Sequence, residues 1–216
     1  MLKTKVKASS ITNLTDARYF AAWEVEWLGF DFDPHSENHL PPRSMKAIKG
    51  WVDGVKFVGE FSTASAQDVS EAIQLLELDA IQLSPFSRAE DIPNLSVSIP
   101  IIQEIIIEPN LTQEEVKELL DSYNGLVQSY LLNFDKNGIS WKNILEGQFW
   151  SASFLSSLCE TFPCIISIDV EAEDLPDMLE KIQPEGLNVI GGEEEKTGFK
   201  SFDQLDEIFE ALEILV

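Results

Sequence analysis

Carboxylate side chains follow several of the short apolar runs in this 216-residue sequence. Glu60, Glu104 and Asp169 come near the ends of the third, fifth and seventh runs, and Asp31 holds the same place in the second. If the runs are strands whose carboxyl ends converge, these side chains form an acidic mouth that suits a cation, an amine-bearing ligand or a divalent metal with oxygen ligands. The alternative is that they are ordinary solvated charges.

Lys7 lies two residues before Ser9 in the first apolar run. Strand side chains alternate between two faces, so both residues point to the same side. Lys7 can therefore pair with an inward carboxylate or take part in catalysis, and we expect the pairing role. Ser9 has no histidine close in sequence to take its proton, and the pKa of a serine hydroxyl is far above the roughly 8.5 of a thiol, so Ser9 is a poor general base.

Other candidate metal ligands are sparse. His35 and His39 stand four residues apart, but Pro34 marks their segment as a loop, so we expect exposed histidines and not a metal pair. Cys159 and Cys164 are too few for a disulfide framework or a structural zinc site, and we expect buried, inert thiols. The sequence therefore predicts no metal and no cofactor.

Acidic residues dominate the charge, with 38 Asp and Glu against 15 Lys and Arg and a net charge of −23. Such a field repels nucleic-acid backbones and anionic lipid surfaces, so we expect neither as a partner. Residues 1–7 lack the apolar run of a signal peptide, and no segment approaches the roughly 18 apolar residues that cross a bilayer. We expect a cytoplasmic monomer or homodimer whose small-molecule ligand the sequence does not identify.

Short strand-like runs alternate with longer segments of helical spacing. Such units imply parallel strands with right-handed crossovers, and eight of them favour an α/β fold of the closed (β/α)8 TIM barrel type, formed by residues 1–216 as one domain. An open flavodoxin-like sheet is the alternative. The predicted strands are Lys5–Ala8, Trp27–Phe32, Val55–Phe61, Ala80–Leu83, Ile101–Ile107, Leu126–Leu132, Cys164–Val170 and Leu187–Ile190, and the predicted helices are Leu14–Trp23, Ser44–Val52, Ala66–Leu76, Gln113–Ser122, a stretch within Ser151–Thr161, Leu175–Ile182 and Phe202–Leu212.

The site of such a barrel lies at the carboxyl ends of its strands, which adds Gln82 to the candidate ligand-binding residues. Five segments also carry a family resemblance: VKASSITNLTDA from residue 6, LGFDFDPHS from 28, VGEF from 58, LDAIQL from 78 and NVIGGE from 188. In order and spacing they are similar to V-K-I-C-G-I-T-N, L-G-F-I-F-x-x-x-S-P-R, V-G-V-F, L-D-x-V-Q-L-H and D-V-S-S-G-V-E of the phosphoribosylanthranilate isomerases of tryptophan biosynthesis. The middle of the chain, from about residue 125 to 164, matches poorly.

The resemblance implies an Amadori rearrangement, in which an aminoaldose becomes an aminoketose. That reaction needs a general acid at the ring oxygen and a general base for the C2 proton. The family's base, a cysteine in the first strand, corresponds to Ser9. Its acid, an aspartate at the end of the sixth strand, corresponds to Ser129, so both catalytic side chains are replaced.

The anion-binding positions of the family differ as well. The arginine that faces the anthranilate carboxylate corresponds to Asn38, and a phosphate-cradling glycine after the seventh strand corresponds to Asp169. Gly191 and Gly192 keep the character of an anion-binding nest. We therefore expect a diverged, non-isomerase paralogue with a small-molecule pocket. The alternatives are a working isomerase that uses Asp169 or Glu60, and a structural or interaction protein with a dead site.

Overall fold

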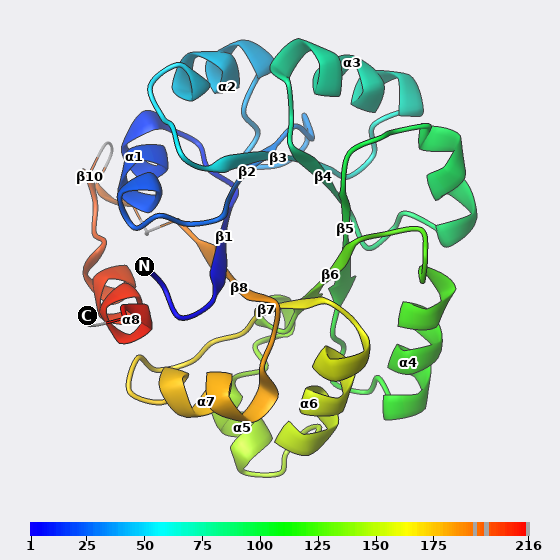
Figure 1. Cartoon of the computed structure of the whole chain (residues 1–216), viewed down its shortest axis with the longest axis vertical. Coiled ribbons are helices and arrows are strands. Elements are labelled where there is room, and N and C mark those ends of the chain that lie inside the picture. The colour runs from blue at the N-terminus through cyan, green and yellow to red at the C-terminus, as the bar shows by residue number, and fades with distance from the viewer. Residues whose placement is uncertain (192–193, 197–198, 215–216) are drawn as a thin grey trace.

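The computed structural model describes residues 1–191, 194–196 and 199–214. Eight parallel strands close into a barrel in which each strand pairs with the next and β8 pairs with β1, and the helices surround it as an outer ring (Figure 1). The expected (β/α)8 barrel is therefore confirmed. The strands are β1 (Lys5–Ser9), β2 (Trp27–Asp31), β3 (Lys56–Phe61), β4 (Ala80–Leu83), β5 (Ile101–Ile106), β6 (Ser129–Asn133), β7 (Cys164–Ser167) and β8 (Gly186–Ile190).

Helices connect most of the strands, and two 3-10 segments and a small antiparallel ribbon complete the fold. The helices are α1 (Leu14–Ala22), α2 (Pro42–Lys49), α3 (Ala66–Leu76), α4 (Gln113–Ser122), α5 (Trp141–Leu145), α6 (Ala152–Thr161), α7 (Leu175–Ile182) and α8 (Asp203–Leu212). The 3-10 segments are η1 (Ala89–Leu95) and η2 (Asp135–Asn137), and the ribbon is β9 (Glu194–Lys196) with β10 (Phe199–Lys200). No helix in the described ranges is both long and apolar enough to cross a bilayer.

Local sequence signals explain where the helices begin. The Asn13 side chain accepts the backbone N–H of Asp16, which caps α1, and Thr112 with Glu115 forms a reciprocal capping box at α4. Bounds for α3, α4 and α7 agree with the sequence prediction. Ser140 caps α5, which the sequence prediction missed because the helix is only five residues long.

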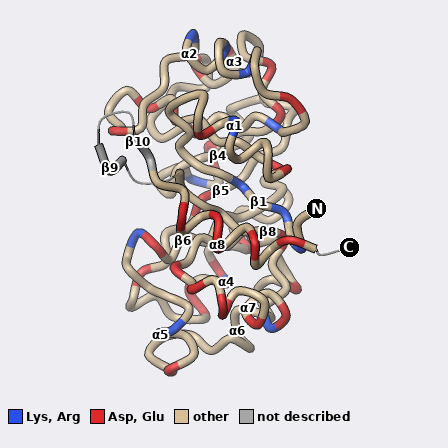
Figure 2. Tube along the Cα trace, turned by 90° about the vertical axis from the view of Figure 1, so that its left-hand side faces the viewer, with Lys and Arg blue, Asp and Glu red and all other residues tan. Residues whose placement is uncertain are grey.

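The helices pack against the outer face of the barrel through one large apolar cluster. Phe20 of α1, Leu120 of α4 and Leu158 of α6 are fully buried there, together with outward strand residues such as Leu28 and Ile166. Burying one such side chain contributes roughly 1.5–3 kcal/mol, so this layer supplies most of the fold's stability. Acidic residues lie on helices and loops along the whole molecule (Figure 2).

Inside the barrel, an apolar layer closes the floor and a polar layer lies above it. Strand side chains alternate with a period of two, so the residue two positions further on faces the interior again. The apolar layer consists of Trp27, Val58, Ala80, Ile102, Leu131 and Ile165. Two positions further along the same six strands stand Gly29, Glu60, Gln82, Glu104, Asn133 and Ser167. The carboxyl-terminal half of the barrel is therefore polar.

Gly29 makes room for the charges of that polar layer. A Cβ atom at this position would lie 2.1 Å from Oε1 of Glu60 and 2.9 Å from Nζ of Lys7. We expect Gly29→Ala to lower the free energy of unfolding by about 1–3 kcal/mol, the usual cost of overpacking, as measured by urea denaturation. Gly50→Ala is the matched control because the nearest atom to its new Cβ, the carbonyl oxygen of Ala47, would lie 3.5 Å away, an ordinary contact distance. Equal stability of the two variants would contradict this account.

Candidate functional site

A buried ion pair lies at the centre of the polar layer. Lys7 is fully buried, and its Nζ atom is 2.5 Å from Oε1 of Glu60. The backbone N–H of Ser10, a residue at φ 54°, donates to the other carboxylate oxygen, Oε2, over 3.1 Å. Both charges are thus neutralised and hydrogen-bonded, as burial requires. The expected pairing of Lys7 with an inward carboxylate is confirmed.

A chain of hydrogen bonds runs from this ion pair across three strands to η2. Lys7 donates to Oγ of Ser9 (2.5 Å), and Ser9 donates to Oδ1 of Asn188 (2.6 Å). Nδ2 of Asn188 donates to Oγ of Ser167 (3.1 Å), which in turn donates to Oδ2 of Asp135 (2.6 Å). Every donor points the same way, from an ammonium group to a carboxylate. The single hydroxyl proton of Ser9 is therefore directed at Asn188.

A second ion pair lies on the opposite side of the polar layer. Oε1 of Glu104 accepts hydrogen bonds from Nζ of Lys136 and from Nδ2 of Asn133, each over 2.8 Å. Glu104 and Asn133 are buried, while about half of the Lys136 side chain is exposed. This ion pair and its amide partner join the ends of β5 and β6.

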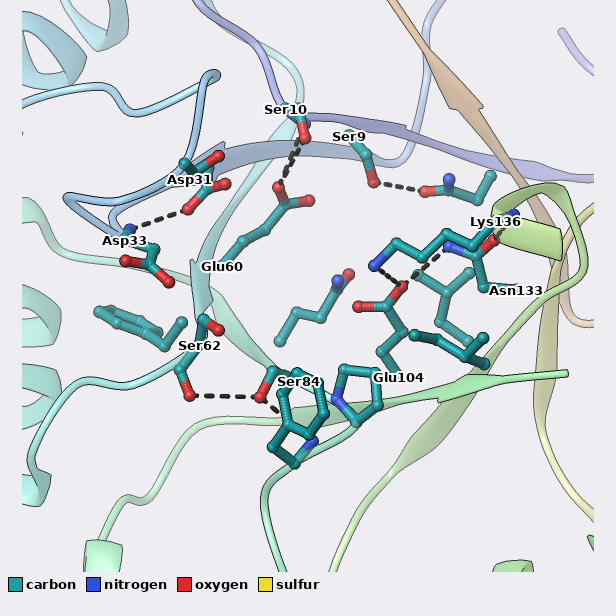
Figure 3. A pocket seen from close by; sticks show the side chains of 18 of the residues that line it. Ser9, Ser10, Asp31, Asp33, Glu60, Ser62, Ser84, Glu104, Asn133 and Lys136 are labelled. Carbon is teal, nitrogen blue, oxygen red and sulfur yellow. Dashed lines mark hydrogen bonds and ion pairs between the residues drawn. The ribbon is translucent and has the colours of Figure 1, made fainter. Parts of the chain in front are cut away.

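Part of these networks lines one pocket of about 270 Å³ at the carboxyl ends of the strands (Figure 3), namely Ser9, Ser10, Glu60, Glu104, Asn133, Lys136 and Asn188. Its acidic lining residues are Asp31, Asp33, Glu60 and Glu104, and among the described residues that line it Lys136 is the one cation. Glu60 and Glu104 are paired with lysines, but Asp31 and Asp33 have no cationic partner in the described part of the chain. Among the residues that the structure describes, the pocket therefore carries an uncompensated charge of about −2.

Five of the eleven predicted site residues meet in this pocket. Ser9, Asp31, Glu60, Gln82 and Glu104 all line it, so the three carboxylates expected from β2, β3 and β5 converge. The lone carboxylate that does not join them comes from the loop after β7. There the strand ends at Ser167 and not, as predicted, at Val170, because the next residues turn outward. Asp169 is exposed and pairs through its backbone with Ser140 and Trp141.

The placement of Ser129 at the end of the sixth strand was wrong. β6 starts at Ser129, and the Ser129 hydroxyl donates to Glu185 at the opposite end of the barrel. The residue that ends β6 inside the pocket is Asn133. The sequence prediction began this strand at Leu126, but the ladder of β6 with β5 and β7 begins three residues later.

Two further candidates also lie elsewhere. Asn38 is exposed in the loop after β2, where its backbone N–H donates to Ser36, and it does not line the pocket. Gly191 directly follows β8, whereas Gly192 lies outside the described residues. Of the two histidines expected to be exposed, His35 is exposed, whereas His39 is half-buried, so the expectation was wrong for His39. No group of three potential metal ligands occurs within the described ranges.

Sequence reasoning missed several residues of the site, namely Asn133, Asn188, Ser167, Asp135 and Lys136. Their signal was present in the period of two: each of the first three lies two positions after an inward residue of its strand. Asp135 and Lys136 belong to the short η2 segment, whose direction no strand pattern fixes.

Comparisons with known proteins agree with this architecture. A family model described as N-(5'-phosphoribosyl)anthranilate (PRA) isomerase matches residues 6–211, nearly the whole chain. The chain belongs to the PRA isomerase family. The PRA isomerase of Maridesulfovibrio salexigens is 26% identical over 211 residues, 96% of this chain and 97% of the relative. That of Gloeothece citriformis is 24% identical and covers 96% of this chain and 93% of the relative.

Solved PRA isomerase structures share the fold. The enzyme from Thermotoga maritima superposes with a TM-score of 0.77 at 20% identity, and that from Thermus thermophilus with 0.74 at 24%. Another structure, at TM-score 0.74 and 20% identity, is a complex with reduced 1-(o-carboxyphenylamino)-1-deoxyribulose 5-phosphate. In each comparison 97% of this chain and 98% of the other chain are covered.

Asp135, at the end of the hydrogen-bond chain, gives the site a pH dependence. Burial raises the pKa of this carboxyl, the Ser167 hydrogen bond lowers it less, and the neighbouring Asp169 charge raises it. A pKa raised by folding means stability that is present at low pH and lost as the pH rises through the folded-state value. We therefore expect Asp135→Asn, whose amide oxygen can still accept from Ser167, to gain stability relative to the parent protein as the pH rises from about 4 to 7.

Glu115 provides a control of opposite sign. Hydrogen bonds from the backbone and side chain of Thr112 lower the pKa of this exposed carboxylate, so its contribution is lost as the pH falls. The free energy of unfolding of the parent protein should therefore increase relative to that of Glu115→Gln as the pH rises. Urea denaturation at a series of pH values measures both differences. Two differences of the same sign would contradict the assignment for Asp135.

Proposed function

We propose that this chain is a PRA isomerase homologue that does not catalyse the family's Amadori rearrangement and instead binds a small molecule in the acidic pocket at the barrel mouth. The observation that carries the proposal is the environment of Ser9. Its oxygen accepts a hydrogen bond from the buried ammonium group of Lys7, and its proton is donated to Asn188. A hydroxyl held in this way cannot take the C2 proton that the rearrangement requires.

The acid side of the reaction lacks its group as well. The family resemblance puts a general acid at the carboxyl end of the sixth strand, and Asn133 stands at that end. A carboxamide has no titratable proton near neutral pH. Its Nδ2 atom already donates to Glu104, so Asn133 supports an ion pair and does not serve as an acid.

The charge of the pocket opposes the family's ligand. The molecule bound to the solved relative carries a phosphate and a carboxylate. Here Asp31 and Asp33 are uncompensated, and Asn38 stands where the family has an arginine. Two like charges about 4 Å apart repel by about 1 kcal/mol in water and about 4 kcal/mol at an effective dielectric constant near 20. An anionic ligand would meet such repulsion without an arginine to offset it.

A second candidate is a working isomerase with different catalytic groups. The observation in its favour is that Glu60 and Glu104 line one pocket, as an acid and base pair must. Both carboxylate oxygens of Glu60 have partners, in Lys7 and Ser10, which leaves Glu104 the freer carboxyl because only its Oε1 atom has a partner among the described residues. Asp169 is exposed and outside this pocket, so it no longer fits that role.

Rescue of a tryptophan auxotroph that lacks PRA isomerase distinguishes the two candidates. We expect no growth with this chain, and growth with the Maridesulfovibrio salexigens relative as the positive control. Growth that disappears in Glu60→Gln or Glu104→Gln would overturn the proposal in favour of the second candidate.

A double variant separates the two reasons for inactivity. Ser9→Cys with Asn133→Asp restores the family's catalytic side-chain types but leaves Asp31 and Asp33, the two carboxylates at the rim of the pocket, unchanged. We expect this variant to give no growth either, since the anionic substrate is still repelled. Growth of the double variant alone would show that the acid–base pair was the only loss and would contradict the electrostatic part of the proposal. Western blotting and circular dichroism check that each variant is made and folded.

A further inference from the structure

We infer that the pocket at the barrel mouth recognises a small organic cation, with the ammonium group facing Asp31 and Asp33 and an apolar body against Phe86. This inference rests on the proposed function and names the ligand class of the same site. Three observations carry it: the fixed carboxylates of Asp31 and Asp33, the buried carboxamide of Gln82 whose oxygen has no partner among the described residues, and the exposed ring of Phe86, which lines the same pocket.

The two rim carboxylates are held in place by the backbone. Oδ1 of Asp31 accepts the N–H of Asp33 over 2.8 Å, and Oδ1 of Asp33 accepts the N–H of His35 over 2.9 Å. Each carboxylate therefore keeps its second oxygen for another donor. Figure 3 shows both side chains together at one side of the pocket. A single ammonium group carries three donors and one positive charge, which suits two neighbouring carboxylates.

Gln82 points to a ligand independently of the acidic cluster. This side chain is 7% exposed and lines the same pocket, yet its Oε1 atom has no hydrogen-bond partner among the described residues. A buried polar group without a partner is costly, so a donor supplied by a ligand would be favourable. Gln82 lies next to Glu60 in the barrel register. Because Lys7 and Ser10 already satisfy Glu60, the carboxamide is the group left to contact a ligand there.

Phe86 supplies the apolar contact. Its side chain is 80% exposed although it lines the pocket, and the loop that carries it is fixed by Ser84, whose Oγ accepts the N–H of Phe86 and donates to the carbonyl of Ser62. An aromatic face beside carboxylates attracts organic cations through cation–π contact and burial of apolar surface. A metal ion would gain nothing from the ring, and no group of three potential metal ligands occurs in the described ranges.

Three probes that differ mainly in charge test the inference. Isothermal titration calorimetry compares 2-phenylethylamine, 2-phenylethanol and 3-phenylpropanoate, which are a cation, a neutral molecule and an anion with the same ring. We expect the amine to bind at least tenfold more tightly than the alcohol and the anion to show no binding. Added salt should weaken binding of the amine. Equal binding of amine and alcohol, or no binding of the amine at millimolar concentration, would overturn the inference.

Variants assign the contacts. The double variant Asp31→Asn with Asp33→Asn should weaken binding of the amine at least tenfold and leave binding of the alcohol unchanged. Phe86→Ala should weaken binding of both. Gln82→Leu should weaken the amine by a smaller factor. Asp121→Asn, an exposed carboxylate on α4, is the matched charge control and should change neither. Thermal denaturation checks that each variant folds, and amine binding that survives the double substitution in a folded protein would overturn the inference.

The outcome separates this inference from the proposed function. If the protein is inactive as an isomerase and does not bind the amine, the proposed loss of isomerase activity stands. In that case only the proposed ligand class is wrong. A protein that rescues the auxotroph would remove the proposed function whatever the calorimetry gives.

Discussion

The polar half of the barrel depends on one buried ion pair, between Lys7 and Glu60. An isolated charge in a protein interior costs several kcal/mol, and a pair is tolerated only with good geometry and further hydrogen bonds. Both conditions are met here: Gly29 leaves the space, and Ser9 and Ser10 satisfy the remaining polar atoms. The position of Ser9, and through it the whole hydrogen-bond chain to Asp135, follows from the need to keep both charges satisfied.

The same constraint links structure to function. A fully buried ammonium group beside Ser9 sets the direction of its hydroxyl, and in the proposed function that direction removes the hydroxyl as a base. At the rim the opposite situation holds, because Asp31 and Asp33 have backbone donors but no cation in the described part of the chain. The barrel thus keeps the fold of the PRA isomerase family over nearly its full length, and the proposed preference for a cation rests on the charge at its mouth.

The sequence alone predicted the barrel, the bounds of three helices and the inward direction of Lys7, because these follow from periodicity and capping within one segment. It failed for Ser129, since strand ends depend on the neighbours with which a strand pairs: Ser129 begins β6, and the residue at the pocket end, Asn133, lies four positions further along. Asp169 failed for a similar reason: the chain leaves β7 early to pair with Ser140, a contact of high sequence separation. Hydrogen-bond partners such as Asn188 and Asp135 became visible only with the register of all eight strands.

The central claim is that this pocket rejects the doubly anionic ligand of its own family. Calorimetric titration with reduced 1-(o-carboxyphenylamino)-1-deoxyribulose 5-phosphate tests it directly, with the Thermotoga maritima isomerase as the control. The account predicts no binding to this chain at millimolar ligand at low salt, where repulsion is screened least. Micromolar binding of that compound to this chain would contradict it.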